Sequence, residues 1–309
     1  MRRSTAGQRL RIPRASRFRA VRVFFRGIAD RFRGITVAEI AGLVTALTAI
    51  GAVLFTARSF EASRWQVELQ RETQINDRYY KAVSQLGSEN LDIRLGAIYS
   101  LERLAVDSPR DHWGVFSVLS AFVRTHAPAG AACDSIEGVA PDIEAASTAI
   151  ARRGYEEDGE ARTRGEEIHS VDVAGACLAG VLMVDVTLTN TDFRGSDLSG
   201  LVVNSSTIID TDFDSADLRG AVLTDTDLRR TGFRAADLSG ATFERCDLDE
   251  VGFQDADLRG ASFRSTSLEG ADVSGADLTG VDLRGVAVAG VRYDGRTVWP
   301  SGFLPPPSR

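Results

Sequence analysis

Residues 191–220 read TDFRGSDLSGLVVNSSTIIDTDFDSADLRG, and an apolar residue returns at every fifth position of this stretch. The spacing holds without a gap from residue 173 to residue 298, and the residue two places before each apolar one is nearly always small or β-branched. A period of five fits neither an α-helix nor an uninterrupted strand. It predicts short extended pieces joined by tight corners, with the apolar residue and the small residue on one inward face.

A second period of twenty residues runs through the same region. One column is aromatic and the next is leucine: Phe193, Phe213, Phe233 and Phe253, and Leu198, Leu218, Leu238, Leu258 and Leu278. If four five-residue units make one coil, each of these residues stacks on its like in the next coil. We therefore predict that they form the core of a square-sided solenoid whose coils pair through their backbones.

The polar positions fit the same geometry. Aspartate recurs one place before the apolar residue, as at Asp217 and Asp237, where an extended piece points outward into water. Glycine, aspartate or serine dominates two places after it, which suits a corner because these residues accept positive φ or bond their own backbone. The many aspartates could suggest calcium binding, but they alternate with arginine, which favours a structural, charged face.

The units at 191–195, 216–220 and 276–280 have the form A(D/N)LxG and resemble the pentapeptide-repeat family. The resemblance implies a right-handed quadrilateral parallel β-helix over residues 171–298. Trp299 and Phe303, with the prolines at 305–307, resemble the terminal cap of that family. We expect residues 299–309 to cover the open end of the solenoid with this cap.

Charge is distributed very unevenly along the 309 residues, whose formal net charge is −7. Residues 1–34 form a basic, partly amphipathic arm with eleven arginines, whereas residues 171–309 hold 22 acidic residues and 12 arginines. The arm could bind nucleic acid or lie on a membrane surface. The apolar segment that follows favours the membrane surface, and we expect no direct binding of nucleic acid.

Residues 35–57 read ITVAEIAGLVTALTAIGAVLFTA, which is long and apolar enough to cross a membrane. A buried core helix would need a polar face, and a signal peptide would have a shorter apolar core and a small-residue cleavage site. We therefore predict a single-pass transmembrane helix in the cell membrane. Its stripe of Ala38, Gly42 and Ala46 is a weak indication of self-association.

Residues 58–153 are expected to form a helical stalk and a small helical module. Apolar residues at helical spacing predict a helix over 91–105, and Ser108 with Asp111 has the pattern of an N-cap and capping box for a helix that follows. The module resembles one found in actinobacterial membrane-bound pentapeptide-repeat proteins, a resemblance that implies no activity. Residues 154–170 are predicted to be an acidic linker.

The sequence predicts no catalytic, cofactor or metal site. His112, His126 and His169 lie in different segments, and Cys133, Cys177 and Cys246 are too widely separated to suggest a disulfide. Cys246 occupies a small inward position, and Cys177 is expected to face outward. No P-loop or dinucleotide-binding motif opens a helix.

Two functions remain open. The first is a non-catalytic, membrane-anchored scaffold that binds an unknown protein partner. The second is implied by resemblance to pentapeptide proteins that protect gyrase, namely a topoisomerase-binding mimic of DNA; the acidic balance favours it, while interrupting arginines and the membrane helix oppose it. The arginine excess before residue 35 favours a cytoplasmic N-terminus, and one crossing then places the repeats outside the cytoplasm.

Overall fold

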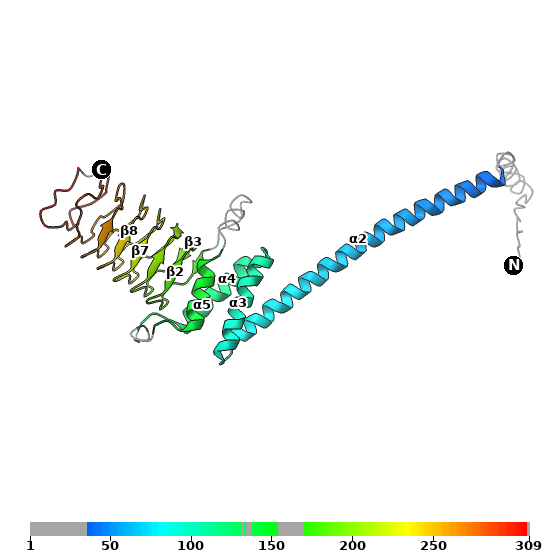
Figure 1. Ribbon diagram of the computed structural model, residues 1–309, viewed down its shortest axis with the longest axis horizontal. Coiled ribbons are helices and arrows are strands. Elements are labelled where there is room, and N and C mark those ends of the chain that lie inside the picture. The colour runs from blue at the N-terminus through cyan, green and yellow to red at the C-terminus, as the bar shows by residue number, and fades with distance from the viewer. Residues whose placement is uncertain (1–35, 131–132, 134–137, 154–169, 308–309) are drawn as a thin grey trace, which may run out of the picture. The chain divides into compact units, whose positions relative to one another are not determined.

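The computed structural model describes residues 36–130, 133, 138–153 and 170–307 (Figure 1). The chain divides into two compact units, Met1–Arg71 and Glu72–Arg309. The predicted basic arm, and all but the last residue of the predicted acidic linker, lie outside the described residues. The second unit contains a helical module and a β-helix, and each is built from short-range patterns that the sequence displays.

Helix α2, Val37–Leu86, contains the predicted membrane span in its N-terminal part. Its start is a capping box, in which Thr36 N donates to Glu39 Oε2 over 2.8 Å and Glu39 N donates to Thr36 Oγ1 over 3.3 Å. The most apolar stretch of 18 residues in α2 has a mean hydropathy of 2.1, and none of that stretch is buried within the protein. The helix is thus long and apolar enough to cross a membrane, and it is not a buried core helix.

The helical module consists of the end of α2 together with α3 (Leu91–Asp107), α4 (His112–His126) and α5 (Pro141–Ala151). Its core is formed by apolar side chains from all four helices, among them Ala82, Leu86, Ile98, Leu101, Leu104, Phe116, Leu119, Ile143 and Ile150. Arg94 of α3 ties the module together, since its Nε lies 2.6 Å from Oδ2 of the buried Asp142 of α5.

The predicted N-cap of α4 is wrong. Ser108 instead ends α3, where its N–H donates to Leu104 O, and α4 begins at His112 after a turn. The Ser108 hydroxyl donates to Asp111 Oδ2 over 2.7 Å, so the two polar side chains bond each other within the turn. Ser108 and Asp111 therefore stabilise the turn between α3 and α4, and they do not form a capping box at the start of α4.

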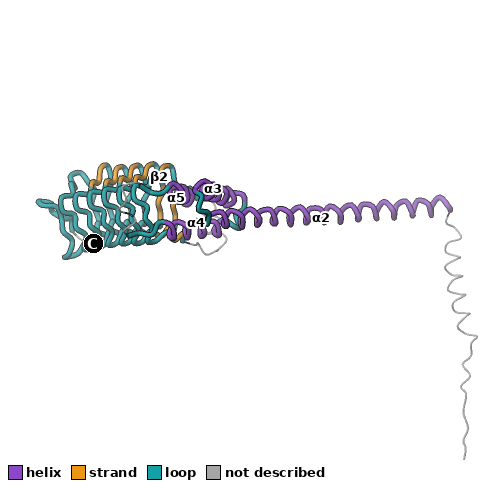
Figure 2. The backbone as a smooth tube through the Cα atoms, turned by 90° about the horizontal axis from the view of Figure 1, so that it is seen from below, coloured by secondary structure: helices purple, strands orange, loops and turns teal. Residues whose placement is uncertain are grey.

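The β-helix is right-handed and quadrilateral. Its coils are stacked side by side (Figure 2) and pair in parallel. Its strands are β1 (Val171–Asp172), β2 (Leu182–Val184), β3 (Thr187–Thr189), β4 (Thr191–Asp192), β5 (Val202–Asn204), β6 (Thr207–Ile209), β7 (Val222–Thr224), β8 (Thr242–Glu244) and β9 (Ser262–Arg264). The longest sheet has the order β2-β5-β7-β8-β9, and β1 pairs with β4 and β3 with β6. Partners are twenty residues apart throughout these strands, as Leu182 with Val202.

The aromatic and leucine columns lie inside the coils. The rings of Phe193, Phe213, Phe233 and Phe253 stack face to face at successive centroid distances of 5.0, 5.2 and 5.4 Å. The predicted leucine column is buried as well: Leu198, Leu218, Leu238, Leu258 and Leu278. The corner residues have positive φ because the chain must turn within one residue. Examples are Gly195, Asp210 and Arg230.

The helical module closes the N-terminal end of the β-helix, a contact that the sequence did not predict. Cys177 N in the first coil donates to Ala127 O over 2.7 Å, and Ala129 N donates to Gly175 O over 2.6 Å. One hydrophobic core continues from the module into the coils. The open edge of the first coil is therefore covered partly by a segment that follows α4.

A disulfide between Cys133 and Cys177 joins this same segment to the first coil, with 5.6 Å between the two Cα atoms. The spacing of the three cysteines did not suggest this disulfide, and Cys177, which was expected to face outward, is one of its two partners. The two residues are 44 apart in sequence, so only the docking of the helical module brings them together.

The last coil departs from the repeat. Asp272 pairs with Arg292, twenty residues on, but Asp277 pairs with Val298, which is twenty-one residues on. One extra residue has entered the coil, and Val298 is turned outward with 48% of its surface exposed. Its expected inward position is therefore wrong; Thr297 takes the inward place of the small residue, and its hydroxyl donates to Val273 O over 2.9 Å.

An aromatic cluster follows this slip. Trp299 packs edge-on against Tyr293 at 5.2 Å between ring centroids and stacks on Phe303 at 5.3 Å. The Tyr293 hydroxyl donates to Pro306 O over 2.7 Å, so the proline segment contacts the last coil. We propose that Trp299 and Phe303 act as the C-terminal cap, since their rings pack against the core.

Candidate interaction surface

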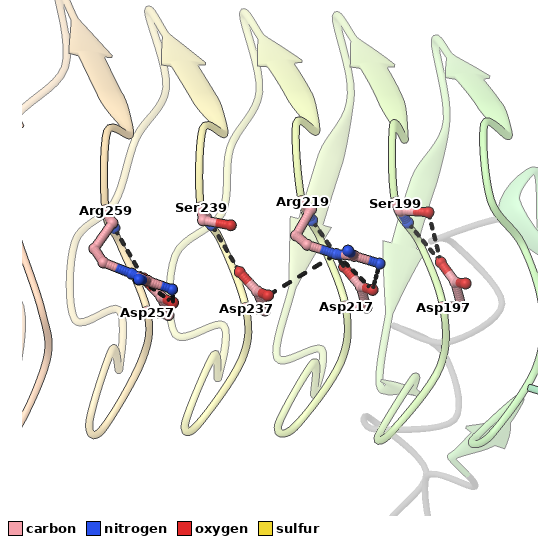
Figure 3. Close-up of polar contacts among 8 residues, drawn as sticks. All are labelled: Asp197, Ser199, Asp217, Arg219, Asp237, Ser239, Asp257 and Arg259. Carbon is pink, nitrogen blue, oxygen red and sulfur yellow. Dashed lines mark hydrogen bonds and ion pairs between the residues drawn. The ribbon is translucent and has the colours of Figure 1, made fainter. Parts of the chain in front are cut away.

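The outward side chains of the β-helix form straight columns, because each coil repeats the one before it. Figure 3 shows one face, on which aspartates form one column and serine alternates with arginine in the next. The residues are Asp197, Asp217, Asp237 and Asp257, with Ser199, Arg219, Ser239 and Arg259. This regular surface is the candidate site for a partner.

Each of these aspartates also shapes the chain. Asp237 Oδ1 accepts the N–H of Ser239 over 3.0 Å, and Asp257 Oδ1 accepts that of Arg259 over 3.1 Å. The carboxylate thus closes a turn around its own backbone and is only partly exposed. One unit has serine instead of aspartate at the equivalent position, and there the Ser267 hydroxyl accepts the Glu269 N–H over 3.0 Å.

Arginines neutralise the aspartates locally. Arg219 binds Asp217 with Nε 2.8 Å from Oδ1 and Nη2 2.5 Å from Oδ2, and its Nε lies 3.9 Å from Asp237 of the next coil. The same pairing, with arginine two residues after aspartate, occurs on the other faces: Asp192 with Arg194, Asp227 with Arg229, and Asp282 with Arg284. The surface therefore alternates in charge.

These contacts lower the pKa of the carboxyl groups. The hydrogen bond from the Arg259 side chain holds the pKa of Asp257 below its ordinary value, and that from Arg284 lowers the pKa of Asp282 to about 2. Asp214 is an exception, since its burial raises its pKa. A carboxyl group with a lowered pKa stabilises the fold only while it is ionised.

We expect the β-helix to lose stability in acid. The pKa values of Asp257 and Asp282 are lowered from 3.8, that of Asp282 to about 2. Their contribution to stability is therefore complete above about pH 4 and is lost as the pH falls through these lowered pKa values. Thermal melting of the full-length protein, followed by circular dichroism across this range, measures the effect.

The matched control is a chain in which Arg219 and Arg259 are both glutamine. Their partners Asp217 and Asp257 should then have pKa values closer to the ordinary one, so the melting temperature should fall less steeply below about pH 4. A wild-type melting temperature that does not change with acidification would contradict a stabilising role for these pairs.

The described residues contain no group of three or more His, Cys, Asp or Glu side chains arranged for a metal ion. His112 is buried with Nδ1 3.3 Å from Ala105 O, His126 contacts the carbonyl of Phe122, and His169 lies outside the described residues. Cys246 is buried, and this burial raises the pKa of its thiol. It packs in the inward position that the sequence predicted.

The columns of outward side chains have one break, which the sequence also displays. On the face with Asp192, Asp212 and Asp272, the two coils between carry Gly232 and Gly252 at the same outward position. A hollow of about 510 Å³ is lined by these two glycines, and the side chains of Asp214 and Gln254 reach the space beside them.

A protein-family model described as pentapeptide repeats matches residues 169–200, 211–249 and 246–285, with eight copies. No curated protein sequence matches the chain. Among solved structures, the chain is similar to the pentapeptide repeat protein Rfr23 from the cyanobacterium Cyanothece 51142. The two are 23% identical over 39% of this chain and 88% of that chain, with a TM-score of 0.22.

Two further structures are similar. HetL, a pentapeptide repeat protein involved in heterocyst differentiation regulation in Nostoc sp. strain PCC 7120, is 26% identical over 42% of this chain and 65% of its own, with a TM-score of 0.20. QnrB1, a plasmid-mediated fluoroquinolone resistance protein, is 23% identical over 38% of this chain and 84% of its own, with a TM-score of 0.18. By these eight matched copies, the C-terminal part of the chain consists of pentapeptide repeats, and these repeats form its β-helix.

Proposed function

We propose that this protein is a non-catalytic scaffold that is anchored in a membrane by α2 and binds a protein partner on the faces of its β-helix. Pentapeptide-repeat proteins are generally non-enzymatic repeat proteins. The stacked phenylalanine core supports a rigid body, and the turn-bound aspartates hold their carboxylates in fixed positions. A partner would therefore meet a preformed surface and would order few side chains on binding.

The N-terminal part of α2 supports membrane attachment. Large apolar side chains on it are exposed in the protein, including Leu47 at 66% and Phe55 at 74%. The hydroxyls of Thr45 and Thr56 donate to carbonyls four residues earlier over 2.8 Å each, so they need no water partner. A lipid bilayer is the environment that such a helix suits.

The disulfide is the main support for our proposal that the helical module and the β-helix lie outside the cytoplasm. Disulfides persist in oxidising compartments and are rare in the cytoplasm, where thiols are kept reduced. The Cys133–Cys177 bond lies between the helical module and the first coil, which supports the proposal that both face away from the cytoplasm. The arginine excess before residue 35 supports the same orientation independently.

Labelling of cysteines in isolated bacterial membranes tests the orientation. We expect a polyethylene glycol maleimide, added to denatured full-length protein without reductant, to modify Cys246 alone, and all three cysteines after reduction. Cys177→Ser is the matched control, because it should release Cys133 for labelling without reductant. Labelling of three cysteines in the unreduced wild type would contradict the placement.

A reporter fused after Arg309 provides a second test of which side of the membrane the β-helix lies on. Alkaline phosphatase, which folds only outside the cytoplasm, should be active there, whereas a fluorescent reporter restricted to the cytosol should be dark. The reverse pattern would favour the topoisomerase-binding mimic of DNA, since gyrase and DNA are cytoplasmic. The column of Asp197, Asp217 and Asp237 is the observation in favour of that second function; its pairing with arginine speaks against it.

A further inference from the structure

The first coil of the β-helix has no coil before it, and the chain covers one side of this edge by adding a strand. Between later coils, each side pairs with the side before it, as where Val202 N donates to Val181 O over 3.0 Å. On the side of the first coil that contains Cys177, the segment after α4 takes the place of a preceding coil. Cys177 N donates there to Ala127 O over 2.7 Å, and the pairing is antiparallel.

The next side of the same edge is β2, where Leu182 is the equivalent of Cys177. Within the part of the chain that the structure describes, β2 pairs with β5 alone. Asp185 N donates to Asn204 O in the second coil, and backbone groups alternate in direction along a strand. The N–H and C=O groups of Leu182 and Val184 therefore point away from β5, and they form no hydrogen bond with any described residue.

These groups face a groove of about 210 Å³ between β2 and α5. Its lining includes Leu182, Met183 and Val184 on one side, and Glu144, Thr148 and Arg152 on the other. The last three are four residues apart, the spacing of one helix face, so this wall extends over about 12 Å. A strand of four residues has about the same length.

The outward surface of β2 is apolar. Leu182 and Val184 are exposed over 54% and 39% of their surface, and Val202 and Val222 continue the column of Leu182 in the next two coils. The equivalent column on the preceding side holds aspartates such as Asp197. A strand added before β2 with β-branched residues on its outward side would extend the apolar column and cover part of Leu182.

We propose that the groove binds an extended segment of a partner protein, which adds to β2 as a further strand. This inference rests on the proposed scaffold function and names the groups through which a partner would bind. The segment would pair with the backbone of Leu182 and Val184. Glu144 and Arg152 form no ion pair with described residues, so they favour a segment with a basic residue at one end and an acidic one at the other.

Hydrogen exchange of backbone amides, followed by NMR on purified full-length protein in detergent micelles, tests the site. The probes are acetyl-Lys-Val-Thr-Val-Glu-amide and the same peptide with its two charged residues exchanged, which covers both strand directions. At ten times its Kd, we expect at least one probe to slow exchange of the Leu182 and Val184 amides about tenfold. The Met183 amide, which faces β5, should not change.

Matched controls separate strand addition from other contacts. The same peptides methylated on their three central backbone nitrogens keep the side chains but lose the donors, so they should give no protection. Val184→Pro removes one outward N–H and no hydrogen bond to β5, so it should weaken binding about tenfold, whereas Val184→Thr should bind as wild type does. Equal protection by the methylated peptides, or none by the unmodified ones, overturns the proposal.

Other occupants of the groove would give different results. Protection of the Leu182 and Val184 amides without peptide would overturn the proposal. If that protection rises with protein concentration, it assigns the groove to a second copy, and if it is constant, to a segment of this chain. None of these results affects the membrane orientation, which the cysteine labelling tests separately.

Discussion

A chain carrying Leu218→Asp should lose the cooperative melting of its β-helix, at a cost of several kcal/mol. Leu218 is completely buried, and so are Leu198 and Leu238, its neighbours in the column. A carboxylate there would have no partner and no water, and it would also interrupt the packing of the coils on either side. Thermal melting of the full-length protein, followed by circular dichroism at neutral pH, measures the loss.

Asp217→Ser, one residue away, is the matched control and should cost little. Asp217 lies on the outward side, and serine can take over its contact with the Arg219 N–H, as Ser267 does for Glu269 in a later unit. Only the ion pair with Arg219 would be lost, and exposed ion pairs contribute about 0–1 kcal/mol. Equal losses from the two substitutions would contradict the assignment of inward and outward positions.

Arg94→Met should destabilise the helical module by about 3–5 kcal/mol, because it leaves a buried carboxylate without its partner. The Asp142 side chain is only 4% exposed, and Arg94 Nε lies 2.6 Å from its Oδ2. Arg94 also donates to the carbonyls of Ser88 and Glu89, so it joins the α2–α3 turn to α5. Urea unfolding of the full-length protein, with hydrogen exchange resolving the module, measures the effect.

Arg110→Met provides the comparison, since Arg110 pairs with Glu72 at 3.3 Å but its side chain is 83% exposed. Its loss should cost no more than about 1 kcal/mol. The double variant Arg94→Met with Asp142→Asn should recover part of the stability, because no charge is then buried. If the two single variants lose the same stability, burial of Asp142 does not determine the strength of its pair.

The sequence predicts the β-helix well because each five-residue unit specifies its own geometry. An inward residue such as Phe213 is identified by its neighbours within the unit, and the twenty-residue period then places it on Phe193. The outward aspartates were predicted to face water. Their second role, in closing the turn, depends on the same short range, and the occurrence of serine at 267 in this position gives a signal for it.

Features that depend on distant parts of the chain were not predictable in this way. The helical module must dock on the first coil before the Cys133–Cys177 bond can form and the coil is covered. No periodic pattern in the sequence predicts that docking. The slip at Val298 was hidden because the residue is apolar and keeps the five-residue count, whereas the true register is set by pairing with Asp277. The hollow at Gly232 needed a comparison between coils and not within a unit.

The exact stacking of one coil on the next also limits how this gene segment can change in length. Because four units make a coil, inserting or deleting a single unit would rotate every later residue to the neighbouring face. The phenylalanine column would then meet leucine, and each arginine would face the wrong aspartates. A gain or loss of twenty residues would leave every column intact, so the β-helix can grow or shrink by whole coils at little cost, and by single units only with a break in its core.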